Sequence, residues 1–228
     1  MKKFLSLFCV ILLTFILLAG CGGKETGQDE TELQFRAPNP GDTIAVFVTS
    51  KGTFKAVLYA DHAPLAVQNF IKLASSGFYD GMEFHRVISD FVVQSGDPAT
   101  KEDGAPANVQ PFRNEYSESL HHYPGALGMA NDREDHNTTQ FYVVKGTSVS
   151  KNLLDQLEQQ GYSAPVIDAY KKHGGLPTLD NRYTVFGQVY EGMEIITKIS
   201  NVKTDVSDRP KKAVTITSIT IEIYEAEE

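Results

Sequence analysis

Short runs of alternating apolar and polar residues dominate the chain from about residue 43 onward. Apolar side chains recur at every second position in residues 43–49 and again in residues 54–58, with turn-forming residues 50–52 between them. This spacing predicts a β-hairpin, because successive side chains of a strand point to opposite faces. Further apolar runs of strand length are residues 84–88, 91–94, 126–130, 141–144 and 183–189.

Two stretches, residues 64–77 and 191–200, have apolar positions three and four residues apart, which predicts helices. These positions are Val67, Phe70, Ile71 and Ala74 in the first stretch and Ile195, Ile196 and Ile199 in the second. Pro64 suits a first helical turn and Gly77 a helix end. Residues 150–176 contain two shorter helical patterns and predict a helical insertion between strands.

The last strand, at about residues 213–224, changes its pattern part-way. Val214 and Ile216 occupy even positions, whereas Ile219, Ile221 and Ile223 occupy odd ones. An unbroken strand would place one of these sets in water, so we expect a β-bulge near residues 217–218. Many short strands with few helices predict a mainly β barrel or sandwich.

Composition narrows the function classes. The chain has 228 residues, of which 41% are apolar, so it can bury the core of one domain. Its net charge of −8 argues against nucleic acid as the main partner. Both cysteines, Cys9 and Cys21, precede the strand pattern, which excludes a disulfide framework. No HExxH or Cys-His cluster occurs, so a zinc site is not expected. We also expect no other metal and no cofactor.

The N-terminus has the pattern of a secretion signal. Lys2 and Lys3 precede an apolar run of 16 residues, 4–19, which is shorter than the roughly 20 residues that a membrane-spanning helix needs. Leu18-Ala19-Gly20-Cys21 follows and resembles the lipobox of bacterial lipoproteins. That resemblance implies cleavage before Cys21 and acyl chains on its thiol, which hold a protein firmly at a membrane.

The expected organisation follows from this N-terminus. We expect a signal peptide at residues 1–20, a lipidated Cys21 with a flexible tether at residues 21–41, and a globular domain at residues 42–226. Loss of Lys2 and Lys3 with the signal changes the net charge from −8 to −10. The expected location is the extracytoplasmic face of the cell membrane, and a monomer is the default oligomeric state.

Four segments together carry a family resemblance. They are FHRVISDFVVQSGD at residues 84–97, PGALGMAN at 124–131, TQFY at 139–142 and LDNRYTVFG at 179–187. In this order they resemble the cyclophilins, a family of peptidyl-prolyl cis–trans isomerases. The resemblance implies a closed eight-stranded antiparallel β-barrel capped by two α-helices, to which the insertion near residues 150–176 would be an addition.

The resemblance also implies site residues. Arg86, Phe91 and Gln94 match the family's catalytic positions. The substrate-binding positions would be Val92, Ala130, Asn131, Gln140, Tyr142, Leu179 and Tyr183. His85 alternates with Arg86 along a strand, so we expect it on the other face in a structural role. Thr178 stands where many members have a tryptophan that contacts cyclosporin, which predicts weak sensitivity to that drug.

The implied reaction needs little reactive chemistry. Rotation about a peptide bond meets a barrier of ~18–20 kcal/mol, because the C–N bond has partial double-bond character. In the twisted transition state this resonance is lost and the prolyl nitrogen gains a lone pair. A donor such as Arg86 would stabilise the twisted state more than the planar one. No nucleophile and no proton transfer are required.

Two alternatives remain open from the sequence. The domain could be a cyclophilin-like module that binds proline segments without turnover. It could also be a lipid-anchored assembly factor whose insertion meets the partner. The presence of Arg86, Phe91 and Gln94 together favours the isomerase. Its expected partners are proline-containing exported polypeptides, together with the membrane that the lipid anchor would enter.

Overall fold

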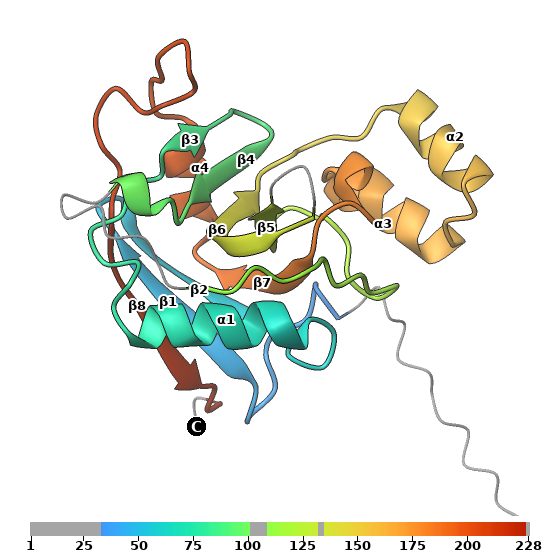
Figure 1. Ribbon diagram of the computed structural model, residues 1–228. Coiled ribbons are helices and arrows are strands. Elements are labelled where there is room, and N and C mark those ends of the chain that lie inside the picture. Colours follow the sequence, from blue (N-terminus) through green and yellow to red (C-terminus); the bar gives the residue numbers. More distant parts are fainter. Residues whose placement is uncertain (1–32, 101–108, 132–134, 227–228) are drawn as a thin grey trace, which may run out of the picture.

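Within residues 33–100, 109–131 and 135–226, which the computed structural model describes, eight antiparallel strands form one curved sheet (Figure 1). Their order is β3-β4-β6-β5-β7-β2-β1-β8. The strands are β1 (Thr43–Thr49), β2 (Gly52–Leu58), β3 (Arg86–Val87), β4 (Val92–Ser95), β5 (Ala126–Asn131), β6 (Asn137–Val144), β7 (Val185–Glu191) and β8 (Ile216–Ile223). The helices are α1 (Pro64–Ser75), α2 (Lys151–Gln159), α3 (Ala164–His173) and α4 (Met193–Ser200). The expected mainly β fold is confirmed.

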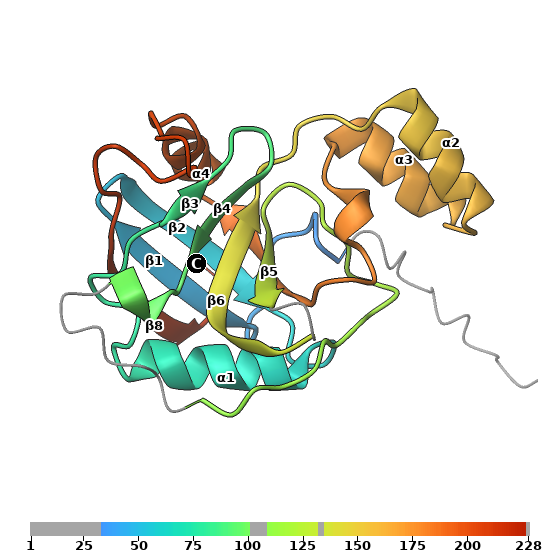
Figure 2. The ribbon, with the colours of Figure 1, turned by 45° about the horizontal axis from the view of Figure 1, so that its top comes forward.

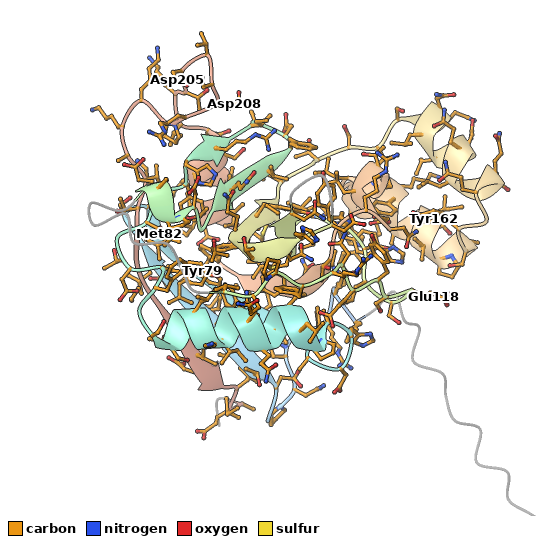
Figure 3. All side chains as sticks on the ribbon, in the orientation of Figure 1. Tyr79, Met82, Glu118, Tyr162, Asp205 and Asp208 are labelled. Atoms are coloured by element: carbon orange, nitrogen blue, oxygen red, sulfur yellow. The ribbon has the colours of Figure 1, made fainter. Side chains whose placement is uncertain are left out.

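The sheet is open between its two end strands, so the expectation of a closed barrel is wrong. β3 and β8 stand at opposite ends of the strand order. β3 has only 2 residues, and Val87 N donates instead to Asp208 O, at 2.8 Å, in the loop labelled in Figure 3. The chain just before β3 bonds to the chain just before β8, with Phe84 N donating to Val214 O at 2.8 Å. Loop backbone therefore occupies the seam where strand pairing was expected.

The predicted β-bulge in the last strand is confirmed. Val48 pairs with Ser218, but Thr49 pairs with Ile216, so Thr217 is the extra residue on β8. The bulge lets Ile216 and Ile219 both face the core, where each is buried. The hairpin is also confirmed, since Thr49 pairs with Gly52 across the turn.

The helices α1 and α4 lie at opposite ends of the curved sheet (Figures 1 and 2). The buried face of α1 consists of Ala66, Val67, Phe70, Leu73 and Ala74. At the first turn of α1, Leu65 N and Ala66 N donate to the Glu115 carboxylate at 3.0 and 2.9 Å. This carboxylate caps donors that have no partner within the helix and complements the positive end of the helix dipole. Tyr79 and Met82, labelled in Figure 3, are buried in the same core.

The predicted insertion consists of α2 and α3, which lie beside the sheet in both ribbon views. The insertion has a small core of its own, made of Tyr123, Leu157, Val166 and Tyr170. At its end, Leu176 N donates to His122 O at 2.8 Å, which attaches it to the segment before β5. In the part of the chain that the structure describes, no helix is long and apolar enough to cross a membrane.

Residues 33–41, which were assigned to the tether, pack on the domain instead. Gln34 is buried, and its amide donates to His121 O and Gln188 Oε1, both at 2.9 Å, and accepts from His121 N at 2.7 Å. The Phe35 ring stacks on His173 of α3, with ring centroids 4.1 Å apart. The ordered domain thus includes these residues. The remaining tether residues and Cys21 lie outside the described residues.

Candidate active site

Three of the expected site residues stand in one row across β3, β4 and β6. Arg86 pairs with Gln94, and Gln94 pairs with Tyr142. Gly128 on β5 continues the row opposite Tyr142. Directly opposed residues of antiparallel strands share a face, so these side chains lie on one surface. Their neighbour Val93 alternates to the other face and joins the main core.

Arg86 is held by two neighbours on that surface. Its Nη1 donates to Gln94 Oε1 at 3.3 Å, and its guanidinium carbon lies 5.9 Å from the centroid of the Phe91 ring. Gln94 in turn donates from Nε2 to Gln140 Oε1 at 2.8 Å. The ring contact is within the ~6 Å range of cation–π attraction. A guanidinium has five N–H donors, so one bond to Gln94 leaves capacity for a substrate.

The apolar residues expected to contact proline belong to one cluster beside Arg86. Val92 and Tyr142 are buried in it, and Phe91, Ala130, Leu179 and Tyr183 are partly buried against it. The Tyr142 and Tyr183 rings meet edge to face, with centroids 6.1 Å apart and planes at 84°. The absence of a side chain at Gly128 makes room for Tyr142, because a Cβ there would collide with its ring. The structure therefore brings all six residues together.

Asn131 at the end of β5 is fixed by a residue that sequence reasoning missed. Asn131 Nδ2 donates to Asn114 Oδ1 at 3.0 Å. Asn114 also accepts from Asn137 Nδ2 at 3.0 Å and donates to Arg182 O at 2.8 Å. It thus connects β5 and β6 to the segment that carries Leu179 and Tyr183. Asn114 lies outside any apolar repeat or motif, so no pattern in the sequence indicates its role.

His85 is partly buried beside Arg86. Burial lowers the pKa of its imidazole, nearby Asp97 raises this pKa, and Arg209 and Arg86 lower it again. A hydrogen bond with Gln140 acts in the raising direction. The net effect is a lowered pKa, so the ring is mainly neutral near pH 7.

Behind Tyr142 lies a buried hydrogen-bond network that sequence reasoning also missed. Tyr142 Oη is 2.8 Å from His122 Nε2, and His122 Nδ1 is 2.7 Å from Asp180 Oδ1. The Asp180 side chain is 3% exposed, and its Oδ2 is 3.0 Å from His121 Nδ1 and 2.6 Å from the Tyr170 hydroxyl. The adjacent histidines were visible in the sequence. Their partner Asp180 is 58 residues from His122, so no local pattern joins them.

The environment of Asp180 predicts how the stability of the fold changes in acid. Burial alone would raise the pKa of Asp180, but hydrogen bonds from His121 and His122 and electrostatic attraction to these two side chains hold it well below its usual range. A group with a depressed folded pKa stabilises the fold above its unfolded pKa of about 3.9, and this stabilisation is lost as the pH falls. We therefore expect the difference in unfolding free energy between the parent and Asp180→Asn to shrink from pH 5 to pH 2.

Urea unfolding at each pH measures this difference. Asp61 is exposed, so Asp61→Asn serves as a control and should differ little from the parent throughout. An Asp180→Asn difference that stays constant down to pH 2 would contradict the assignment of a buried, ionised carboxylate.

Comparison with known proteins covers the same segments. The family model described as "Cyclophilin type peptidyl-prolyl cis-trans isomerase/CLD" matches residues 44–221. The chain belongs to this family. Two curated relatives of this cyclophilin, from Staphylococcus aureus strain USA300 and Staphylococcus saprophyticus, each carry the name "Putative peptidyl-prolyl cis-trans isomerase". They are 40% identical to it over 183 and 184 residues, which is 80% of this chain and 93% of each relative.

Solved structures share the fold of this cyclophilin. A crystal structure of a cyclophilin type isomerase from Cryptosporidium parvum matches with a TM-score of 0.63 at 24% identity, over 81% of this chain and 99% of that one. A structure of the same kind from that organism, determined in the presence of the dipeptide Ala-Pro, has a TM-score of 0.61 at 25% identity, over 78% and 98% of the two chains.

Proposed function

We propose that this cyclophilin accelerates cis–trans isomerisation of X-Pro bonds in exported polypeptides, with Arg86 as its catalytic residue. The observation that carries this proposal is the placement of Arg86. It is held by Gln94 and the Phe91 ring at the margin of the cluster that contains Tyr142. A cationic donor and an apolar surface for a proline ring thus share one face of the sheet.

The mechanism follows from where charge develops. The proline ring rests on the cluster of Phe91, Val92 and Tyr142, and the bond before it twists. As resonance is lost, the prolyl nitrogen becomes an acceptor, and an Arg86 N–H donates to it. The planar amide has no such lone pair, so this bond forms chiefly in the transition state and lowers the barrier.

The polar neighbours hold the substrate backbone. The amide of Gln94 orients Arg86, and Gln140 fixes Gln94 through a bond of 2.8 Å. The backbone of Asn131 pairs with an extended substrate while its side chain is held by Asn114 at 3.0 Å. The dipeptide Ala-Pro, present with the related Cryptosporidium parvum protein, is a minimal substrate of the proposed class.

We further propose a lipid anchor at Cys21 and a place on the extracytoplasmic face of the cell membrane. The supporting features are the basic start, the apolar run of 16 residues at 4–19 and the sequence Leu18-Ala19-Gly20-Cys21. Exported chains complete proline isomerisation after crossing the membrane, and without catalysis each X-Pro bond takes tens of seconds or longer. A tethered monomer would meet these clients where they emerge.

Isomer exchange of a short Ala-Pro peptide, followed by NMR, tests the activity. The protein is the chain from residue 21 with Cys21→Ser, which retains every described residue. We expect faster exchange between the cis and trans signals at substoichiometric protein. Binding without acceleration would instead indicate the non-catalytic proline-binding module.

Fractionation of cells that make the full chain tests the anchor. We expect the parent protein in the membrane fraction and Cys21→Ser in the soluble extracytoplasmic fraction. Equal membrane association of both would contradict lipidation at Cys21.

A further inference from the structure

We propose that His122 and Asp180 are positioning residues for proline binding, which act through the Tyr142 hydroxyl and connect helix α3 of the insertion to the site. The inference rests on the proposed function, because it takes the cluster around Tyr142 as the surface that receives proline. Neither residue is among the positions to which substrate contact was assigned above. Their effect therefore passes through Tyr142.

The donors of this network run in one direction. Asp180 is a carboxylate with acceptors only, so His122 Nδ1 donates to Oδ1 across 2.7 Å. In the neutral ring His122 Nε2 is then the acceptor, and the Tyr142 hydroxyl donates to it across 2.8 Å. Burial raises the pKa of Tyr142 well above its ordinary value, so this hydroxyl keeps its proton. The partners thus assign one tautomer to His122.

The hydroxyl is the point at which the Tyr142 ring is best restrained. It lies at the far end of the side chain, so a swing about χ1 moves it furthest, whereas rotation about χ2 leaves it in place. A bond to His122 therefore opposes displacement of the ring out of the cluster. Gly128 lies against the same ring, and Tyr183 meets it edge to face at 6.1 Å between centroids. The ring is thus bounded by β5, by Tyr183 and by His122.

The same network reaches into the insertion. Tyr170 of α3 is fully buried, and its hydroxyl donates to Asp180 Oδ2 at 2.6 Å and accepts from His122 N at 3.1 Å. The backbone beyond α3 also approaches closely, because a Cβ at Gly175 would lie 2.5 Å from His122 O. Helix α3 of the insertion therefore holds both His122 and Asp180, the two residues whose hydrogen bonds restrain Tyr142. This gives the insertion a role at the site without contact with substrate.

A double-mutant cycle tests the positioning role. Tyr142→Phe removes the hydroxyl, and His122→Asn retains a donor near the Nδ1 position for Asp180 but is too short to reach Tyr142. For the Cys21→Ser chain from residue 21, we expect each variant to weaken Ala-Pro peptide binding and slow catalysed exchange by roughly three- to tenfold. The double variant should lose no more than either single one, because both remove the same bond. Tyr190→Phe, on β7, is the matched control and should change neither quantity.

The outcomes separate this inference from the proposed function. Losses that multiply in the double variant, or single variants that bind and catalyse like the parent, would overturn the positioning role. A parent that binds the peptide but does not accelerate exchange would overturn the proposed activity, while the cycle measured on binding still decides the positioning role. A parent that does neither would overturn both.

A measurement on the parent does not depend on folding of the variants. The ¹⁵N signals of the His122 ring report its tautomer, and we expect the proton on Nδ1. The proton on Nε2 would overturn the inference, since Tyr142 could then not donate to that atom.

Tyr170→Phe tests the link to α3: we expect a roughly twofold loss of peptide binding that disappears in the Tyr142→Phe background. An equal loss in both backgrounds would overturn the link.

Discussion

Replacing Arg86 by alanine is expected to lower kcat/KM for an Ala-Pro peptide by about 10- to 100-fold. Under the proposed mechanism the lost interaction is a charge-assisted hydrogen bond to the prolyl nitrogen. Such a bond contributes about 1.5–3 kcal/mol in ordinary settings, and each 1.36 kcal/mol corresponds to tenfold in rate. The fold should tolerate the change, because Arg86 is only partly buried and its bond to Gln94 is long, at 3.3 Å. NMR exchange measures the rate, and thermal unfolding measures the fold.

Two further variants sharpen this result. Arg86→Lys keeps the charge but loses the planar fork of donors, so we expect it to recover only a small part of the rate. Lys212 is exposed, and Lys212→Ala removes one positive charge away from the site, so it should leave the rate unchanged. A rate that survives Arg86→Ala would retain the isomerase but exclude Arg86 as the donor to the prolyl nitrogen.

Much of the fold could be predicted because its signals are local. The change from even to odd apolar positions predicted the bulge that the structure places at Thr217. The apolar repeat of residues 64–77 likewise predicted α1, with Pro64 at its first turn. In each case the apolar residues of the buried face recur at a fixed spacing within one short segment. The period of that spacing distinguishes a strand from a helix.

The parts that were wrong depend on partners far away in the sequence. The prediction of a closed barrel was wrong because β3 is 2 residues long and Val87 bonds to the loop at Asp208. Strand length and loop pairing of this kind leave no periodic signal. The expected tether, residues 21–41, extends into the ordered domain. Its residue Gln34 is polar and has polar neighbours, but it is buried because its amide makes three hydrogen bonds. A hydropathy pattern does not show that a polar side chain will find buried hydrogen-bond partners.

The site divides along the same line. Arg86, Gln94 and Tyr142 could be placed together because motifs fixed their positions, and the strand register brings them into one row. His122 and Asp180 could not, because a hydrogen-bond network is specified by geometry between distant segments rather than by residue spacing. The residues proposed to contact substrate could therefore be grouped from the sequence, whereas the residues behind them required the structure.

The largest effect on stability is expected at Phe70 on α1. Its side chain is fully buried, and its ring meets those of Tyr79, Phe141 and Phe186 at centroid distances of 5.4, 5.6 and 5.2 Å. Phe70→Ala removes these contacts and leaves a cavity between α1 and the sheet, which costs about 3–5 kcal/mol. For a chain of this size we expect Tm to fall by roughly 6–20 °C.

Leu65 lies on the same helix but is 49% exposed, so Leu65→Ala is the matched control and should change stability by less than about 1 kcal/mol. Urea unfolding gives both free energies, and the exchange rate at low temperature shows whether the folded fraction keeps its activity. We expect folded Phe70→Ala to retain kcat/KM, because its ring lies in the main core and the site cluster is on the other face of the strands. Equal losses of stability for the two variants would contradict the assignment of the α1 face to the core. A large loss of kcat/KM in folded Phe70→Ala would instead show that the core and the Tyr142 surface are coupled through the sheet.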